Sequence, residues 1–153
     1  ERIANILQKK EASLSVAESC TGGAIAQEIT AIPGASAYFK GGIVPYETQQ
    51  KTNILGVPAN IIAEHTVVSG EVAASMAEHC TKLFGSEYAL ATTGIAGPTK
   101  GDATDEVGTV YIAIATPAGV VSERFSFGKL RERVIAKATN KAFEMLLKEI
   151  SKN

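Results

Sequence analysis

The chain has 153 residues and a mass of 16.0 kDa, the size of one ordinary domain. Hydrophobic residues make up 45% and charged residues 20%, which is typical of a globular protein and not of a disordered one. The net charge of −1 and the few aromatic residues (five Phe, four Tyr, no Trp) argue against a nucleic-acid binder. Two cysteines are too few for a disulfide framework, and no apolar run reaches the length of about 18 residues that a membrane span needs.

Apolar periodicity predicts strands alternating with helices in the first half of the chain. The strands are short and apolar, and Pro33 with Gly34 ends the first helix. In chain order we expect a strand at 14–17, a helix at 21–30, a segment rich in Gly and aromatic residues at 37–46 that lies at a sheet edge or near a site, and short helices at about 47–54 and 59–64.

The second half begins with a helix whose ends are marked in the sequence. Ser69 is a good N-cap, Gly85 suits a helix end, and an apolar stripe between them runs to Leu83 and Phe84. After it we expect a strand at 88–92, a hairpin of strands 107–115 and 120–127 through the turn at 117–119, and a terminal helix whose apolar stripe starts at Leu130.

This order predicts a three-layer α/β/α domain on a mixed, mostly parallel sheet, with residues 1–153 in a single domain. No Cys or His pair has metal-ligand spacing, and two cysteines favour a reduced, cytoplasmic protein. Ligands of such sheets bind beyond the carboxyl ends of the strands. The loops at 18–23 and 93–98 are expected there.

The first of these loops carries a candidate nucleophile. Ser19 follows a strand end, and N–H groups at the start of the next helix, near Thr21, would be free to hold an oxyanion or a phosphate. Gly22 and Gly23 would let a ligand approach the backbone. The same residues also fit a simple N-capped turn, because no G-x-S-x-G or phosphate-loop pattern is present.

The second loop leaves two interpretations open. The small residues of 94–97 suit either a close approach to a ligand or a tight turn. Further along, Asp102, Asp105 and Glu106 could hold a cation, but their spacing matches no calcium motif and favours a solvated acidic loop.

A nucleophilic serine needs a base. His65 and His79 are predicted on helices away from the strand ends, so a Ser-His-Asp triad has little support. A Ser–Lys pair is the remaining common arrangement, and Lys51, after the glycine-rich stretch, is one candidate among many lysines.

The charge is unevenly distributed along the chain. Residues 129–153 hold seven cations and three anions, a net charge of +4, which leaves −5 for the rest. This basic helix could meet a phosphate, with Arg131 near its start as the candidate, although scattered lysines on a helix more often form a solvated face.

Five sequence blocks together resemble a known family. They are Val16–Gly23 (VAESCTGG), Pro33–Phe39 (PGASAYF), Gly41–Val44 (GGIV), Thr93–Pro98 (TGIAGP) and Val107–Tyr111 (VGTVY). In this order, and over nearly the whole chain, they resemble the C-terminal domain of the competence-damage-inducible CinA proteins, which also occurs alone as bacterial nicotinamide-nucleotide amidase. The resemblance implies an α/β/α fold, hydrolysis of nicotinamide mononucleotide to nicotinate mononucleotide and ammonia, and a Ser–Lys site without metal or organic cofactor.

Carried over to this chain, the resemblance implies Ser19 as nucleophile, Lys51 as general base, and Tyr46 as a residue that orients Lys51 or contacts the substrate. Substrate-binding residues are expected in the two loops, in the glycine-rich stretch and at the basic helix: Thr21, Gly22, Gly23, Gly42, Thr93, Gly94, Ala96, Gly97 and Arg131. The expected partner is the nucleotide, without nucleic acid or membrane, and a second copy of the chain is a further candidate.

The chain departs from the family pattern at three places. The segment Val44–Lys51 (VPYETQQK) differs at four positions from the usual Val-Thr-Tyr-Ser-Asn-Glu-x-Lys. Asp105-Glu106 stands where the family usually has Lys-Pro. Gly128–Glu132 is one residue longer than the usual Gly-Asp-Arg-Glu, and Ile135 occupies a position that is often basic. Two candidate phosphate contacts are thereby lost. The alternative to the enzyme is therefore a nucleotide-binding or interaction domain of a longer CinA-like protein with weakened catalysis.

Overall fold

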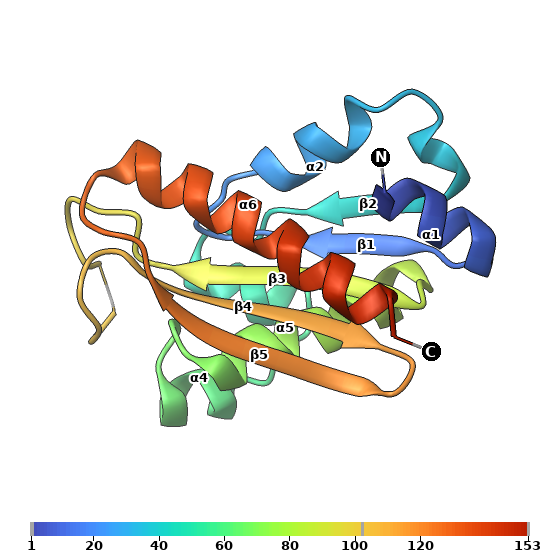
Figure 1. Cartoon of the computed structure of the whole chain (residues 1–153). Coiled ribbons are helices and arrows are strands. Elements are labelled where there is room, and N and C mark those ends of the chain that lie inside the picture. The colour runs from blue at the N-terminus through green and yellow to red at the C-terminus, as the bar shows by residue number, and fades with distance from the viewer. Residues whose placement is uncertain (1, 102, 153) are drawn as a thin grey trace.

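The computed structural model describes residues 2–101 and 103–152 and contains a five-stranded mixed sheet (Figure 1). The strands are β1 (Leu14–Ala17), β2 (Phe39–Ile43), β3 (Tyr88–Gly94), β4 (Thr109–Thr116) and β5 (Gly119–Ser126), in the order β2-β1-β3-β4-β5. β1 pairs in parallel with β2 and β3, whereas β4 pairs antiparallel with β3 and β5. Four of these five strands thus point the same way, as predicted, although only two of the four pairings are parallel.

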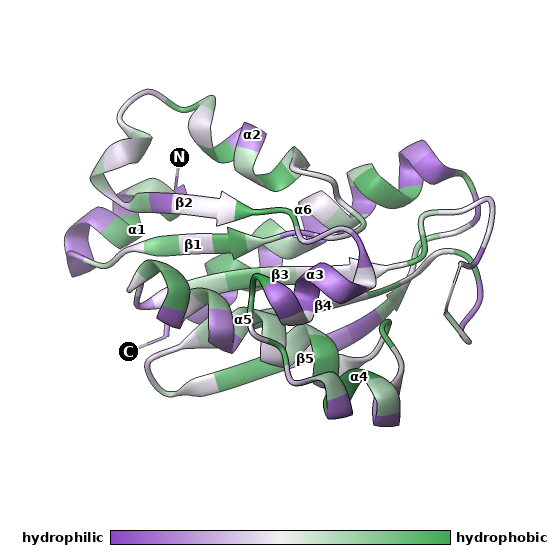
Figure 2. Ribbon diagram, turned by 180° about the vertical axis from the view of Figure 1, so that it is seen from behind, coloured by the Kyte–Doolittle hydropathy of each residue, from purple (hydrophilic) through white to green (hydrophobic). Residues whose placement is uncertain are grey.

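Helices cover both faces of this sheet and confirm the predicted three-layer architecture. On one face lie α1 (Arg2–Lys10), α2 (Ala24–Thr30) and α6 (Arg131–Ile150), in front of the sheet in Figure 1. On the other lie α3 (Thr48–Asn53), α4 (Ala59–His65) and α5 (Gly70–Phe84), in front in Figure 2. A single 3₁₀ turn, η1 (Ala35–Ala37), precedes β2.

Side chains of different size make the two faces of the sheet unlike. The strand residues packed under α6 are large and include Leu14, Val16, Leu90, Val110, Ile112 and Ile114. Those packed under α5 are Ala17, Ala89, Ala91, Ala113 and Ala115. Because successive strand residues point to opposite faces, this alternation in the sequence sorts large and small side chains into the two cores, and the alanine face can accommodate a closely packed α5.

Helix boundaries agree with the predicted caps and correct two burial expectations. The Ser69 hydroxyl accepts the N–H of Val72, and Gly85 closes α5 with a φ of 66°, as its lack of a side chain permits. Leu83, however, is exposed, because it lies on the solvent side of α5. Leu130 is exposed too, because it is the residue that precedes α6 rather than part of the helix.

Two further differences concern helix starts. α1 was not predicted, and it packs Leu7 into the core under α6. α2 begins at Ala24, three residues after the predicted start, because Gly22 and Gly23 adopt positive φ angles in a turn. Within the described residues, no helix combines the length and the apolar character that a bilayer crossing requires.

Candidate active site

A cavity of about 220 Å³ lies where β1 and β3 end. Its lining comes from the loop after β1 (Ser19, Cys20), Tyr46 and helix α3 (Thr48, Lys51), the connection before α5 (Val67, Val68), the end of β3 (Thr93, Gly94), the loop after it (Ile95, Ala96, Gly97, Thr99, Lys100, Gly101, Ala103) and the start of α6 (Arg131). We call it the Ser19 cavity. It occupies the carboxyl ends of parallel strands, where ligands of α/β sheets bind.

Ser19 and Lys51 are in direct contact at the floor of the cavity. The Lys51 Nζ atom lies 3.0 Å from the Ser19 hydroxyl oxygen, and the lysine is 1% exposed. The backbone N–H of Ser19 donates to the carbonyl oxygen of Thr92 at 3.2 Å, which holds the serine against the end of β3. Burial lowers the pKa of Lys51 from 10.5 to about 8, so that about a tenth of the amine is neutral at pH 7.

Two carbonyl groups orient the lysine. The Nζ atom also contacts the carbonyl oxygens of Pro45 at 3.0 Å and Tyr46 at 3.4 Å. A neutral amine has two N–H donors and one lone pair. If the two carbonyls take the two N–H groups, the lone pair faces the Ser19 hydroxyl, which is the geometry that a general base requires.

Cys20 lines the same cavity but is the weaker nucleophile candidate. Its side chain is 4% exposed and belongs to the core under α6. Burial raises the pKa of its thiol to about 12, so the reactive thiolate is scarce at neutral pH. The cysteine thus has contact with the cavity but not the ionisation state for attack.

The N-terminus of α2 is occupied by a buried carboxylate. Glu18, which has no exposed surface, accepts the N–H groups of Gly23, Ile25 and Ala26 and the hydroxyl of Thr21 at distances between 2.6 and 3.2 Å. The N–H groups of Gly22 and Ala24 donate to carbonyls within the same turn.

This arrangement corrects the expectation that the start of α2 binds a ligand. The N–H groups from Gly22 to Ala26 already have partners, and Thr21, Gly22 and Gly23 do not line the Ser19 cavity. Their role in the structure is to fix the turn that carries Ser19. A free anion at this helix end would compete with Glu18 for the same donors.

Gly42 is also outside the cavity. It lies in β2 opposite Val16, and a Cβ atom there would come within 2.6 Å of the Val16 Cγ2 atom. The structure therefore gives this glycine a packing role rather than a place among cavity residues, because the Val16 side chain of the neighbouring strand β1 occupies the space that a side chain at 42 would need.

The end of β3 and the loop after it line the cavity with all four residues expected there, Thr93, Gly94, Ala96 and Gly97. A Cβ atom on Gly94 would lie 2.7 Å from Val110 Cγ2 and 3.0 Å from Cys20 Sγ, so only glycine fits between them.

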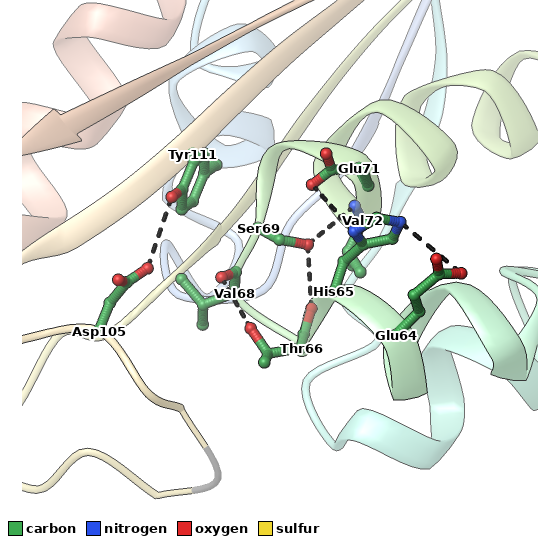
Figure 3. A network of polar contacts seen from close by, with 9 residues as sticks. All are labelled: Glu64, His65, Thr66, Val68, Ser69, Glu71, Val72, Asp105 and Tyr111. Atoms are coloured by element: carbon green, nitrogen blue, oxygen red, sulfur yellow. Dashed lines mark hydrogen bonds and ion pairs between the residues drawn. The ribbon is translucent and has the colours of Figure 1, made fainter.

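A neighbouring turn holds the apolar part of this wall. The Thr93 hydroxyl donates to the carbonyl oxygen of Val67 at 3.0 Å. Figure 3 shows how the segment before α5 is fixed: the Ser69 hydroxyl donates to the carbonyl of Thr66, and the Thr66 hydroxyl donates to that of Val68. The turn therefore sets Val67 and Val68 in place before α5 begins.

Tyr46 and Arg131 meet across the mouth of the cavity, although 85 residues separate them. The Arg131 guanidinium donates to the Tyr46 hydroxyl at 2.9 Å and to the carbonyl oxygen of Gly97. Tyr46 was expected to orient Lys51 or to contact the substrate. Its backbone carbonyl contacts Lys51, and its side chain contacts Arg131. A planar guanidinium held in this way presents its remaining donors in a fixed orientation.

Sequence reasoning missed several lining residues. Thr48, Thr99, Val67, Val68 and Lys100 carry no motif of their own, and loop proximity alone would have suggested Thr99 and Lys100. Neither histidine lines the cavity: His65 contacts Glu64 and Glu71 (Figure 3), and His79 bonds to the carbonyl oxygen of Ser75.

The acidic loop offers no metal centre in the part that the structure describes. Asp105 accepts the Tyr111 hydroxyl at 3.5 Å, and Asp102 lies outside the described residues. Among residues 2–101 and 103–152, no three His, Cys, Asp or Glu side chains gather at a point that could hold a metal ion.

An α/β/α domain with a buried Ser–Lys pair at its strand ends is the class that this fold and site define. A family model described as the CinA C-terminal domain matches residues 1–150, and the chain belongs to this family. A CinA-like protein of Flavobacterium psychrophilum is 54% identical over 99% of the chain, and one of Geotalea uraniireducens is 45% identical over 97%. The chain spans only about a third of the length of these relatives, 36% and 35%.

Solved structures agree with this assignment. A competence-damaged protein (CinA) superfamily protein from Klebsiella pneumoniae superposes with a TM-score of 0.93 at 31% identity, covering 98% of this chain and 94% of the other. A competence/damage-inducible protein from Agrobacterium tumefaciens gives a TM-score of 0.87 at 31% identity, covering 99% and 97%. The α/β fold is therefore that of the CinA superfamily.

Proposed function

We propose that this domain hydrolyses the carboxamide of nicotinamide mononucleotide to nicotinate mononucleotide and ammonia. The observation that carries the proposal is the 3.0 Å contact between Lys51 Nζ and Ser19 Oγ, with the lysine buried and its pKa lowered to about 8. A serine paired with a partly neutral lysine is a hydrolytic arrangement found in several unrelated enzymes. The nucleotide as substrate rests on the resemblance to nicotinamide-nucleotide amidase.

In the proposed first half-reaction, Ser19 Oγ attacks the carboxamide carbon while its proton passes to Lys51 Nζ. The tetrahedral intermediate collapses when the C–N bond breaks, and the protonated lysine returns a proton to the leaving nitrogen, which departs as ammonia. An ester between Ser19 and the nicotinoyl group remains. Water then attacks this ester, Lys51 takes its proton and passes it back to Ser19, and the acid is released.

The oxyanion of each intermediate needs donors other than the start of α2, whose N–H groups are taken by Glu18. Cys20, Ala96 and Gly97 are among the candidates, because they line the cavity and their backbone N–H groups donate to no other described residue. In other hydrolases one such donor contributes roughly 3–4 kcal/mol to transition-state stabilisation.

The competing candidate is a nucleotide-binding domain of a longer protein that retains the pocket and has weak catalysis. The departures between Val44 and Lys51 favour it, since they adjoin the proposed base. Our proposal includes a cytoplasmic location, to which the two buried free cysteines lend support, and a second copy of the chain as a candidate partner. No cofactor takes part in the proposed reaction.

Ammonia release separates the two candidates. The purified domain is incubated with nicotinamide mononucleotide, and ammonia and nicotinate mononucleotide are measured over time. The proposal predicts equal, time-dependent amounts of both products. Saturable binding of the nucleotide without product would favour the binding domain instead.

A further inference from the structure

Two cations line the Ser19 cavity besides the proposed base. Lys100 and Arg131 are exposed, whereas Ser19 and Lys51 are buried. No aspartate or glutamate is among the described residues that line the cavity. The described lining residues therefore offer a bound ligand two cations, Lys100 and Arg131, in addition to the Ser19–Lys51 pair.

Arg131 is fixed in position and retains donors for a ligand. Two of its N–H groups donate to the carbonyl oxygen of Gly97 and the Tyr46 hydroxyl. A guanidinium has five N–H donors, so three remain. Its attachment to two elements of the cavity wall means that little side-chain freedom is lost when an anion binds.

Lys100 belongs to the loop after β3. The N–H of Ala103 donates to the carbonyl oxygen of Lys100 at 3.2 Å, and both residues line the cavity. Lys100 also borders a neighbouring hollow together with Glu106 and Lys129, but no ion pair of the described residues includes it. Lys100 thus adds a positively charged side chain without an ion-pair partner among the described residues to the lining of the Ser19 cavity.

The acidic pair later in the same loop stays out of the cavity. Asp105 accepts the Tyr111 hydroxyl at 3.5 Å, and neither Asp105 nor Glu106 lines the cavity.

We propose that Lys100 and Arg131 form an anion subsite that binds the phosphomonoester of the nucleotide, with Lys100 as the residue that distinguishes a nucleotide from its nucleoside. The subsite rests on the proposed function for the identity of the nucleotide. Its recognition chemistry is the pairing of an ammonium and a guanidinium with phosphate oxygens.

Equilibrium binding tests the subsite without depending on turnover. Nicotinamide mononucleotide, nicotinamide riboside and ribose 5-phosphate are titrated into a Ser19→Ala protein and into the same protein with Lys100→Ala. The matched control is Lys129→Ala, which removes a lysine that borders the neighbouring hollow but not this cavity.

The subsite predicts that Lys100→Ala weakens binding of both phosphorylated probes by about tenfold or more, the size of one charge-assisted hydrogen bond, and reduces its dependence on salt. Riboside binding and the Lys129→Ala control should change by less than about twofold. An equal loss for nucleotide and riboside, no loss for the nucleotide, or no binding of either phosphorylated probe would overturn the subsite. Nucleotide binding that depends on Lys100, together with no ammonia release by the wild-type domain, would support the subsite and contradict the amidase.

Discussion

At the scale of single residues, the adjacent pair Ser19 and Cys20 decides the chemistry. Both line the cavity, but Ser19 contacts Lys51 whereas the Cys20 thiol is buried with a pKa raised to about 12. We predict that Ser19→Ala lowers kcat by at least about 10³-fold with the nucleotide dissociation constant within a few-fold, because a nucleophile acts mainly in the transition state.

Cys20→Ala is the matched control for this prediction. It should retain at least about a tenth of wild-type kcat and lower the melting temperature, since it leaves a small cavity in the core. The measurement is ammonia release under saturating substrate. An inactive Cys20→Ala protein next to an active Ser19→Ala protein would reverse the assignment.

At the scale of elements, the turn between β1 and α2 depends on one carboxylate. Glu18 accepts three backbone N–H groups and the Thr21 hydroxyl, with both of its oxygens used. Glu18→Gln puts an amide NH₂ against at least one of these donors. We predict a loss of roughly 2–3 kcal/mol in the free energy of unfolding.

The same variant should lower kcat more than it changes KM, because Glu18 positions the Ser19 turn and does not line the cavity. Thr30→Ala, an exposed change at the other end of α2, serves as the control and should alter stability by less than about 0.5 kcal/mol. Denaturant unfolding and steady-state kinetics measure both effects. A Glu18→Gln protein with wild-type stability would show that the carboxylate does not hold the turn.

Local patterns predicted most elements because their signals lie within a few residues. Ser69 and Gly85 mark α5, and the alternating strand residues mark the two cores. α1 has helical spacing of Ile3, Ile6 and Leu7 over only nine residues, which is too short for periodicity alone to indicate a helix.

The site was predictable only where a motif carried it. Ser19 and the 93–97 loop follow strand ends and could be inferred from topology, and Lys51 came from the family resemblance. The contact of Arg131 with Tyr46 joins segments 85 residues apart. The Glu18 carboxylate accepts backbone N–H groups at the start of α2, as far along the chain as Ala26. Such contacts depend on tertiary packing, for which the linear sequence has no local signal.

At the scale of the whole molecule, Lys51 links catalysis to global stability. Its folded pKa of about 8 lies below the unfolded value of 10.5, so the unfolded chain binds more protons between these pH values. Burial of this lysine therefore lowers stability by about 3 kcal/mol below pH 8, and the penalty fades as the pH rises to 10.5.

Lys51→Met removes this titration while keeping most of the buried stem. It also leaves the carbonyls of Pro45 and Tyr46 without their lysine donor. At pH 7 the stability gained by removing the buried charge is therefore partly offset by the stability lost with these hydrogen bonds. We predict that the melting temperature of wild type minus that of the variant is constant below pH 8 and rises steadily between pH 8 and 10.5. The exposed Lys129→Met control should show no such trend. A difference independent of pH would mean that Lys51 titrates normally.

The most direct test of the proposed Ser19–Lys51 chemistry is the pH dependence of kcat/KM for ammonia release from nicotinamide mononucleotide between pH 6.5 and 9.5, above the second phosphate ionisation near 6. A base with a pKa of about 8 predicts that kcat/KM rises about tenfold per pH unit and levels off near pH 8, and that Lys51→Met retains less than about a hundredth of it at every pH. A flat profile, a break near 6.5 as for a histidine, or a Lys51→Met protein with more than about a tenth of wild-type activity would contradict the assignment of Lys51 as the base.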